Sequence, residues 1–264
     1  MKYILITGAG GGMGASTAKH LAAEGYTVFA LDKNASESGE NIIPIFADVT
    51  DEESIRLAFG KIREITDELF AVIHFAGLYM LDSLVELGTE EYDRIFNVNI
   101  RGVYLINKIF LPLLSKGSRI VITTSELAPL DPLPFTGIYA ITKSALDKYA
   151  YSLRMELQLL GIHVSVLRAG AVETSMLSVS TDALDRFCES TKLYSCNAES
   201  FKAIVENVEA RSVSPKKIGQ KMSYIIGKKK PGFAYSINRN PLLLMLNILP
   251  SRLQFYIIKN VLHS

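Results

Sequence analysis

Tyr139 and Lys143 are the residues whose types and spacing could most directly support a reaction. They lie four positions apart, so a helix over about 139–160 would place them on one face. A free tyrosine has a pKa of about 10, which is too high for efficient proton exchange at neutral pH. A neighbouring ammonium group would stabilise the phenolate and lower that pKa, so the pair could transfer protons. An ordinary amphipathic helix that contains both residue types is the alternative interpretation.

A glycine-rich turn near the N-terminus suggests a cofactor for this pair. The apolar run 2–7 predicts a buried strand, the glycines follow directly, and 15–23 has the composition of a helix. A strand, a glycine turn and a helix N-terminus together form an anion site that a pyrophosphate can approach closely. Combined with Tyr139 and Lys143, the turn indicates an enzyme that moves a hydride and a proton between an alcohol or carbonyl and a nicotinamide. The expected contacts in the turn are Gly8, Gly10, Gly12, Met13 and Gly14.

A carboxylate ends the second apolar strand, which is expected at 27–32. Asp32 at this position would accept hydrogen bonds from the adenosine ribose hydroxyls and repel a 2′-phosphate. The sequence therefore favours NAD(H) over NADP(H). Lys33 weakens this preference and leaves NADP(H) open, because a cation there could bind a 2′-phosphate. A solvated turn is the alternative interpretation of Asp32.

Several motifs in one order make the chain resemble the short-chain dehydrogenase/reductase family, of the Tyr-x-x-x-Lys type, along nearly its whole length. The matching positions are the TGxxxGxG turn, Asp32, Asp48 with Val49, Ala76 with Gly77, Asn99, Ser125, Tyr139 with Lys143, and Gly170 with Thr174. Eight ordered matches are far more specific than any one of them. The loop 171–174 and the apolar C-terminal segment are loosely similar to the steroid and retinol dehydrogenase branch of the family.

The resemblance implies a role for each matching residue. Tyr139 is the expected general acid/base, and Lys143 would bind the nicotinamide ribose and lower the tyrosine pKa. Ser125 would hydrogen-bond the substrate oxygen, and Asn99 would help to order a proton relay. The expected cofactor contacts beyond the glycine turn are Asp32, Asp48, Val49, Ala76, Gly77, Tyr139, Lys143, Gly170, Val172 and Thr174.

Two positions depart from the family pattern. His74 and Phe75 stand where the family has two asparagines, and Ala169 stands where it has a proline before Gly170. We interpret His74 as a hydrogen-bonded core residue and not as a catalytic one. Neither departure removes a group that would take part in the chemistry.

Strand-like runs alternate with helical stretches and must position these residues. The runs lie at 2–7, 27–32, 42–47, 70–75, 119–124, 162–168 and 233–237. This alternation predicts an α/β, doubly wound Rossmann fold with a mostly parallel seven-stranded sheet and helices on both faces. The ligand should lie at the carboxyl ends of the strands, where Gly8, Asp32 and Ser125 fall. No linker or repeat divides the chain, so residues 1–264 are expected to form a single domain.

Two segments are expected to set specificity. The connection at about 175–211 is long and is expected to form a substrate lid, whose bulky apolar residues indicate a hydrophobic substrate. Packing of the lid onto the body is an equal alternative for each of those residues. The apolar tail at about 241–262 is too short to span a membrane and could be a wall of the substrate site, a subunit contact or a surface helix that touches a membrane. We favour the first two. The candidate substrate contacts are Met176, Leu177, Phe187 and Tyr194.

Composition argues against several other classes of protein. The net charge of +1 gives no indication of nucleic-acid binding, and Cys188 and Cys196 are too few and too far apart for a typical metal site. The chain begins directly on the first strand, so we expect no signal peptide and a cytoplasmic protein with reduced thiols. The family resemblance also implies a homodimer or homotetramer. The residues that could fill its interface, or could instead face the sheet, are Leu105, Ile109, Leu146 and Leu153.

The sequence thus predicts an NAD(H)-dependent short-chain alcohol dehydrogenase or ketone reductase. Its substrate would be a small hydrophobic secondary alcohol or ketone, in the manner of a hydroxysteroid dehydrogenase. One alternative is an NADPH-dependent reductase of small carbonyl compounds, which Asp32 disfavours. Another is a non-catalytic, dinucleotide-binding regulator, which the intact set of catalytic-type residues disfavours.

Overall fold

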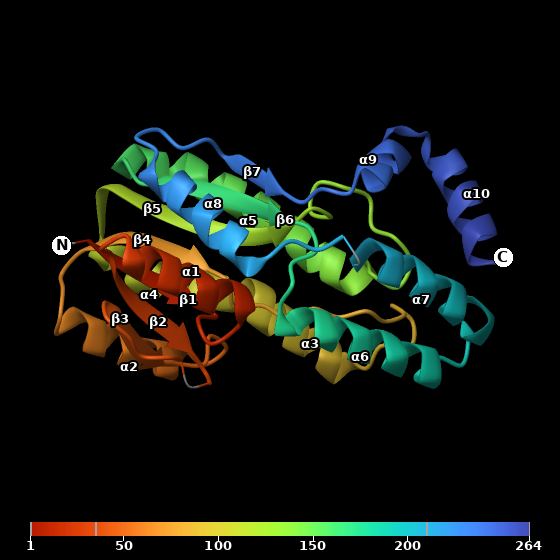
Figure 1. Ribbon diagram of the computed structural model, residues 1–264, viewed down its shortest axis with the longest axis horizontal. Coiled ribbons are helices and arrows are strands. Elements are labelled where there is room, and N and C mark those ends of the chain that lie inside the picture. The colour runs from red at the N-terminus through yellow and green to blue at the C-terminus, as the bar shows by residue number, and fades with distance from the viewer. Residues whose placement is uncertain (1, 35, 210, 264) are drawn as a thin grey trace.

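The computed structural model describes residues 2–34, 36–209 and 211–263, with side chains described outside 175–182 and 207–209. Within these residues, seven strands form one sheet in the order β3-β2-β1-β4-β5-β6-β7, and every neighbouring pair is parallel (Figure 1). The predicted doubly wound α/β fold is therefore confirmed. The strands are β1 Tyr3–Thr7, β2 Thr27–Asp32, β3 Ile42–Phe46, β4 Leu69–His74, β5 Leu114–Ser125, β6 His163–Ala169 and β7 Ala234–Ile237.

Helices cover both faces of the sheet. Along β1, Ile4 and Ile6 belong to the core under one face, and Leu5 belongs to the core under the other. Successive side chains of a strand point to opposite faces, so a continuous apolar run is what a sheet covered on both sides requires. One face carries α1 Gly12–Ala23 and α8 Pro215–Gly227, and the other carries α2 Glu52–Arg63, α4 Gly102–Phe110 and α5 Gly137–Leu157.

The strand boundaries agree with the predicted runs except at β5. This strand already begins at Leu114, because Leu114 pairs with Leu69 before an irregular segment that contains Gly117. Strand order reverses at β1, which has β2 on one side and β4 on the other. In open α/β sheets, ligands bind in the crevice at the carboxyl ends of the strands at such a reversal.

The remaining long helices gather at the carboxyl end of the sheet (Figure 1). The segment expected to form the lid folds as α6 and α7, which share an aromatic core with Phe135, Phe187 and Phe201. The apolar tail folds as α9 and α10 on either side of Pro250. Among the described residues, no helix combines the length and apolar character needed to cross a bilayer. These helices are α3 Thr89–Phe96, α6 Ser175–Ser190, α7 Ser195–Glu209, α9 Pro241–Ile248 and α10 Ser251–Leu262.

The four leucine and isoleucine side chains considered for a subunit interface face the sheet. Leu105, Ile109 and Leu146 are buried in the core of the α2, α4 and α5 face, and Leu153 packs against that core. The large apolar and aromatic side chains that α4 and α5 do expose are Tyr104, Ile141, Tyr151 and Met155.

Candidate active site

The hydroxyl groups of Ser125 and Tyr139 meet at the end of the sheet. Ser125 is the last residue of β5, and Tyr139 lies in the first turn of α5. The two side chains are hydrogen-bonded to each other. Burial raises the pKa of Tyr139 to about 12, the Ser125 hydrogen bond opposes that rise, and the nearby Glu126 carboxylate adds to it. The phenol is therefore protonated at neutral pH and can donate a proton.

Lys143 lies one turn further along α5, but its amine does not bind the phenol oxygen. Its Nζ donates to the carbonyl oxygen of Thr123 at 3.3 Å and lies 5.6 Å from the centroid of the Tyr139 ring. Burial lowers the pKa of Lys143 to about 8. The prediction that Lys143 lowers the pKa of Tyr139 is wrong for this structure, because desolvation of the phenol outweighs a cation that is directed elsewhere.

Asn99 ties the loop after β4 to α5. It lies in a π-helical turn, Asn97–Arg101, a form that is often found at functional sites. Its Oδ1 accepts from the Leu78 amide at 2.7 Å, and its Nδ2 donates to the Leu78 carbonyl and to the Thr142 hydroxyl, both at 3.0 Å. A Cβ added at Gly77 would lie 3.3 Å from Asn99 Oδ1 and 3.5 Å from Lys143 Nζ. The structure thus brings Asn99, Gly77 and Lys143 close together, and the relay role of Asn99 stays a prediction.

The glycine turn forms a tight backbone cradle between β1 and α1. A Cβ at Gly8, which has a φ of 72°, would lie 2.4 Å from the Ala76 nitrogen. A Cβ at Gly14 would lie 2.1 Å from the Gly8 oxygen, and one at Gly12 would lie 2.5 Å from the Thr174 side chain. These contacts leave no room for side chains, so the backbone itself forms the surface at the start of α1. Such a surface fits a pyrophosphate.

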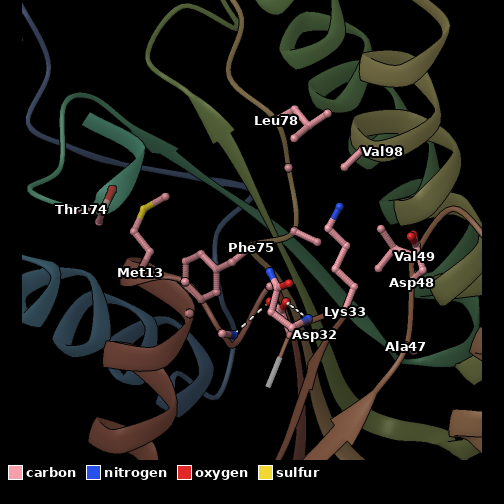
Figure 2. Close-up of a pocket in the computed structure, with 18 residues that line it drawn as sticks. Met13, Asp32, Lys33, Ala47, Asp48, Val49, Phe75, Leu78, Val98 and Thr174 are labelled. Carbon is pink, nitrogen blue, oxygen red and sulfur yellow. Dashed lines mark hydrogen bonds between the residues drawn. The ribbon is translucent and has the colours of Figure 1, made fainter. Parts of the chain in front are cut away.

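Asp32 is held at the end of β2 over this turn (Figure 2). Its Oδ2 accepts from the Gly10 amide at 2.9 Å, and its Oδ1 accepts from the Asn34 amide at 2.8 Å. Two backbone donors therefore fix the carboxylate at the place where an adenosine ribose would have to lie. Lys33 lines the same cleft.

The cleft around these groups has a volume of about 310 Å³. In Figure 2, Met13 and Thr174 lie on one side of it, and Asp48 and Val49 lie on the other. Residues outside the predicted set of cofactor contacts also line it, among them Lys33, which was considered only as a possible partner of a 2′-phosphate. The predicted cofactor residues that line the cleft are Gly8, Gly10, Gly12, Met13, Gly14, Asp32, Asp48, Val49, Ala76, Gly77 and Thr174, and the added ones are Gly11, Lys33, Asn34, Ala47, Phe75, Leu78 and Val98.

A second cavity, of about 190 Å³, adjoins the cleft and contains Ser125 and Tyr139. Met13 and Thr174 line both spaces, so they form the boundary between the cofactor cleft and this cavity. The predicted cofactor residues Gly170 and Val172 line the cavity and not the cleft. Most of the other lining residues are apolar, and they are Tyr79, Leu127, Leu133, Phe201, Ile204, Val205 and Leu243.

Two of the four candidate substrate residues lie elsewhere. Phe187 is 2 % exposed and packs into the lid core, with its ring centroid 4.5 Å from that of Phe135. Tyr194 packs edge-on against Phe135 and lines a separate cavity beside α10. Both are corrected to packing residues, because Phe187 on α6 and Tyr194 in the connection between α6 and α7 turn their rings toward Phe135. The side chains of Met176 and Leu177 lie outside the described part of the chain.

Glu126 is a buried carboxylate in the wall of the cavity, and the sequence analysis did not identify it. Its Oε2 accepts from the Asn240 amide, which joins the wall to the start of α9. Burial raises the pKa of this carboxyl group, while the Asn240 hydrogen bond opposes the rise. Gly170 allows the approach of the final strand, because a Cβ there would lie 1.9 Å from the Asn238 carbonyl oxygen.

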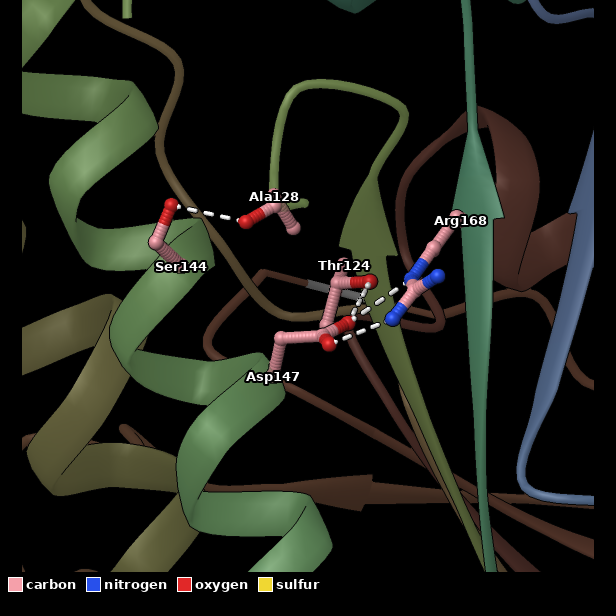
Figure 3. Close-up of polar contacts among 5 residues, drawn as sticks. All are labelled: Thr124, Ala128, Ser144, Asp147 and Arg168. Atoms are coloured by element: carbon pink, nitrogen blue, oxygen red, sulfur yellow. Dashed lines mark hydrogen bonds and ion pairs between the residues drawn. The ribbon is translucent and has the colours of Figure 1, made fainter. Parts of the chain in front are cut away.

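An ion pair behind the catalytic-type residues locks α5 to the sheet (Figure 3). Arg168 of β6 donates from Nε and a terminal nitrogen to the two carboxylate oxygens of Asp147, at 3.0 and 2.6 Å. Thr124, which precedes Ser125, donates to the same carboxylate at 3.4 Å. Asp147 lies one turn beyond Lys143, so this pair fixes the helix that carries both Lys143 and Tyr139. Nothing in the local sequence could have paired residues so far apart.

His74 is a hydrogen-bonded core histidine, as predicted. Its Nε2 lies 2.9 Å from Asn107 Oδ1, and burial lowers its pKa to about 4. The ring is therefore neutral at pH 7. It contacts α4 through Asn107 and lines neither of the two cavities.

Known proteins are similar to this chain in sequence and in fold. The sequence model for short chain dehydrogenase matches residues 2–185. Mouse (Mus musculus) estradiol 17-beta-dehydrogenase 2 is 35 % identical over 197 residues, which cover 70 % of this chain and 51 % of that protein. The chain thus spans about half the length of this relative. A 3-ketodihydrosphingosine reductase from Bacteroides thetaiotaomicron is 27 % identical over 242 residues, which cover 88 % of this chain and 86 % of that protein.

Solved structures agree on the fold. A short chain dehydrogenase family protein from Francisella tularensis has a TM-score of 0.75 at 21 % identity, over 90 % of this chain and 97 % of that one. The 3-ketoacyl-(acyl-carrier-protein) reductase from Brucella melitensis, complexed with NADH, has a TM-score of 0.73 at 23 % identity, over 89 % and 96 %. The family uses nicotinamide dinucleotides, which the glycine cradle fits. The chain belongs to the short-chain dehydrogenase/reductase family of oxidoreductases.

Proposed function

We propose that this protein interconverts a secondary alcohol and a ketone on a hydrophobic, steroid-like substrate, with NAD(H) as cofactor. The observation that carries the proposal is the position of Ser125 and Tyr139. Their hydrogen-bonded hydroxyls line an apolar cavity that shares Met13 and Thr174 with the dinucleotide cleft. A carbonyl group held there would lie beside the cofactor.

The residues of the chain would bind, orient and protonate the substrate oxygen. The bound nicotinamide would supply or accept the hydride. Ser125 and Tyr139 would both hydrogen-bond the oxygen, which orients the carbonyl and stabilises charge that develops on it. Because burial keeps the Tyr139 phenol protonated, it would donate its proton during ketone reduction. The buried Lys143 amine and Asn99 lie behind it and would return the proton from solvent.

The preference for NAD(H) rests on Asp32. Its carboxylate is fixed by two amides at the end of β2 and would repel a 2′-phosphate. Lys33 lines the same cleft, and one relative is named as NADPH-dependent, a 1-acyldihydroxyacetone phosphate reductase from Schizosaccharomyces pombe that is 30 % identical over 185 residues. A reductase that uses NADPH is therefore the alternative.

Titration of the purified protein with NADH and NADPH, followed by cofactor fluorescence, tests the preference. We expect NADH to bind at least tenfold more tightly, since placing a 2′-phosphate against a carboxylate costs on the order of 1–2 kcal/mol. Asp32→Ser should remove most of that difference. Tighter binding of NADPH by the unaltered protein would reject NAD(H) and favour the alternative.

The substrate class follows from the cavity wall. Most of the side chains in this wall are apolar, including three from α7 and one from α9, and Glu126 adds one carboxylate close to Ser125. A hydrophobic ketone that also carries a hydroxyl or amino group would match this wall, because that group could donate to Glu126. The relatives named for estradiol and 3-ketodihydrosphingosine support a lipophilic substrate.

Turnover with a panel of ketosteroids and long-chain ketones in the presence of NADH tests the activity. We expect oxidation of NADH with at least one lipophilic ketone and much less with short aliphatic ketones. Cofactor binding without turnover of any carbonyl compound would instead support the non-catalytic regulator. Glu126→Gln should raise KM for ketones that carry a donor group and leave KM for simple ketones unchanged.

A homodimer or homotetramer in the cytoplasm remains our expectation for the assembly and its location. The exposed Tyr104, Tyr151 and Met155 on α4 and α5 support an interface on that side of the sheet. Sedimentation velocity of the protein and of a Tyr151→Ser/Met155→Ser variant would test it, with a smaller species expected for the variant.

A further inference from the structure

The helices α9 and α10 expose large apolar side chains over adjacent turns. Leu242, Met245 and Ile248 of α9 are 64, 65 and 82 % exposed, and Phe255 and Tyr256 of α10 are 70 and 66 % exposed. The two helices project at the end of the molecule away from the N-terminus (Figure 1). Single exposed apolar residues are ordinary, but a contiguous group of this kind marks a surface that binds something.

The charge of this part of the chain indicates what would bind. No Asp or Glu follows Glu209, whereas ten Lys and Arg residues do. The preceding part has the opposite balance, with 27 Asp and Glu against 18 Lys and Arg. The chain is therefore nearly neutral as a whole but strongly basic toward its C-terminal end.

Basic and aromatic side chains alternate on the exposed face of α10. Arg252, Tyr256 and Lys259 are spaced so that they share one side of the helix, and Phe255 flanks them. Within the described residues, neither Arg252 nor Lys259 forms an ion pair with a carboxylate. Their charges are thus available to an external partner.

A second copy of the chain fits this surface poorly. A two-fold interface brings the same patch of both copies together, so Arg252 and Lys259 would face basic groups with no acidic residue on α9 or α10 to offset them. An anionic lipid surface offers a partner for the basic side chains and another for the apolar ones. Its phosphates would bind the basic groups, and its acyl region would accept the apolar and aromatic ones.

The surface is continuous with the proposed substrate cavity. Leu243 lines that cavity, while its neighbours Leu242 and Met245 on α9 point outward and are exposed. A further cavity of about 560 Å³ lies between α10 and the loop that carries the exposed Leu84 and Val85. The helix α9 therefore presents apolar groups on its outside and also contributes to the cavity that contains Ser125 and Tyr139.

We propose that α9 and α10 bind the surface of anionic membranes and place the mouth of the substrate cavity at the lipid. The side chains of Met245, Phe255 and Tyr256 would enter the interface, and Arg252 and Lys259 would contact lipid phosphates. A lipophilic substrate would then reach the cavity past α9 without crossing water. Membrane binding itself does not depend on the proposed function; only the uptake of substrate rests on it.

Flotation of the purified full chain with lipid vesicles tests the proposal. We expect binding to vesicles of phosphatidylcholine that contain about 30 % phosphatidylglycerol, and at least tenfold weaker binding to pure phosphatidylcholine. Raised salt should weaken the binding to the anionic vesicles, because exposed charges are screened. Equal binding to both vesicle types, or none to either, would overturn the proposal.

Matched variants test whether vesicle binding depends on α9 and α10 or on exposed apolar and basic residues in general. Met245→Ser/Phe255→Ser should reduce vesicle binding at least tenfold, whereas Leu57→Ser/Leu159→Ser, which changes residues of similar exposure on other elements, should leave it unchanged. Arg252→Gln/Lys259→Gln should also reduce binding at least tenfold. Lys216→Gln/Lys217→Gln, with the same loss of charge on α8, should have little effect. Equal losses in a variant and its control would contradict a specific surface.

Two further readouts keep the alternatives distinct. Sedimentation velocity without lipid should give the same species for the protein and for Met245→Ser/Phe255→Ser. Dissociation of an oligomer in that variant would show that a second copy covers the surface and would overturn the lipid assignment. Turnover of a water-soluble ketone should be the same in both proteins, so a loss of vesicle binding with normal turnover would be a failure of membrane docking and not of the proposed reaction.

Discussion

The cofactor cleft and the substrate cavity share a boundary but are built in different ways. In the cleft, backbone atoms approach one another so closely that Gly8 and Gly14 cannot carry a side chain. In the cavity, side chains such as Phe201 and Leu243 form the surface. A backbone cradle requires glycines at fixed spacing, whereas many combinations of apolar residues can line a cavity. The sequence therefore identifies the ligand of the first region and only the general polarity of the ligand of the second.

The largest effect is expected from a substitution that removes the proton donor and leaves the cofactor cleft and the substrate cavity intact. Tyr139→Phe should reduce kcat by roughly 10²–10⁴, because the proton donor is lost. NADH affinity should not change, since the ring and its packing against Tyr79 remain. Tyr151→Phe, the same change at an exposed position of α5, is the control and should retain full activity. Full activity in Tyr139→Phe would reject the assignment of Tyr139 as acid/base.

Removal of a buried ring from the lid core should destabilise the protein and leave the cofactor cleft unaffected. Phe187→Ala removes a buried ring and should lower the free energy of unfolding by about 3–5 kcal/mol. Phe255→Ala removes an exposed ring and should change it by less than about 0.5 kcal/mol. Urea denaturation measures both. NADH affinity under native conditions should be the same in the two variants, and a large loss of affinity in Phe187→Ala would show that the regions are coupled.

The addition of a single methyl group at Gly14 should distort the glycine cradle and weaken cofactor binding. The Cβ of Gly14→Ala would lie 2.1 Å from the Gly8 oxygen, so the cradle must move, at a cost of about 1–3 kcal/mol in stability. NADH affinity should fall at least tenfold. Gly60→Ala lies in α2 with open space around its Cβ and should instead stabilise the protein by about 0.5–1 kcal/mol. Isothermal calorimetry and urea denaturation would check the pair, and equal NADH affinity in Gly14→Ala would contradict the cradle.

The smallest effect concerns acid stability and His74. The pKa of His74 is lowered to about 4 in the folded protein, below its ordinary value near 6.5. Between these values the unfolded chain binds a proton that the folded protein does not, so stability should fall as the pH drops from about 6.5 to 4. His74→Asn, which restores the residue usual in the family, should lose less stability between about pH 7 and pH 5. Urea midpoints at the two pH values measure it, and identical losses would contradict this origin.

Prediction from sequence was most successful where spacing alone specifies geometry. The strands and the glycine turn could be anticipated, because each depends on local periodicity or on backbone constraints. The direction of the Tyr139 pKa could not, since it depends on how far α5 is buried and on a carboxylate, Glu126, whose position was unknown. The relay role expected of Asn99 and the ribose contact expected of Lys143 came from the family resemblance alone.

Contacts between distant segments were the main omission. The Arg168–Asp147 ion pair joins β6 to α5, and the Glu126–Asn240 contact joins the residue after β5 to the N-cap of α9. Neither has a local sequence signature. The substrate contacts expected of Phe187 and Tyr194 were misplaced for a related reason, because an apolar residue in the lid can face either the cavity or the lid core, and the sequence pattern does not distinguish the two.

Asn238 fixes the backbone just before the C-terminal helices α9 and α10. Its side chain donates to the carbonyls of Ala171 and Arg211 at 2.8 and 2.7 Å, and its own carbonyl lies over Gly170. We therefore expect changes beyond this residue to leave the glycine cradle in place, whereas Asn240 and Leu243 still contribute to the substrate cavity. For protein engineering, the consequence is that the segment after Asn238 is where we expect substrate range and surface binding to be altered with least disturbance of the glycine cradle.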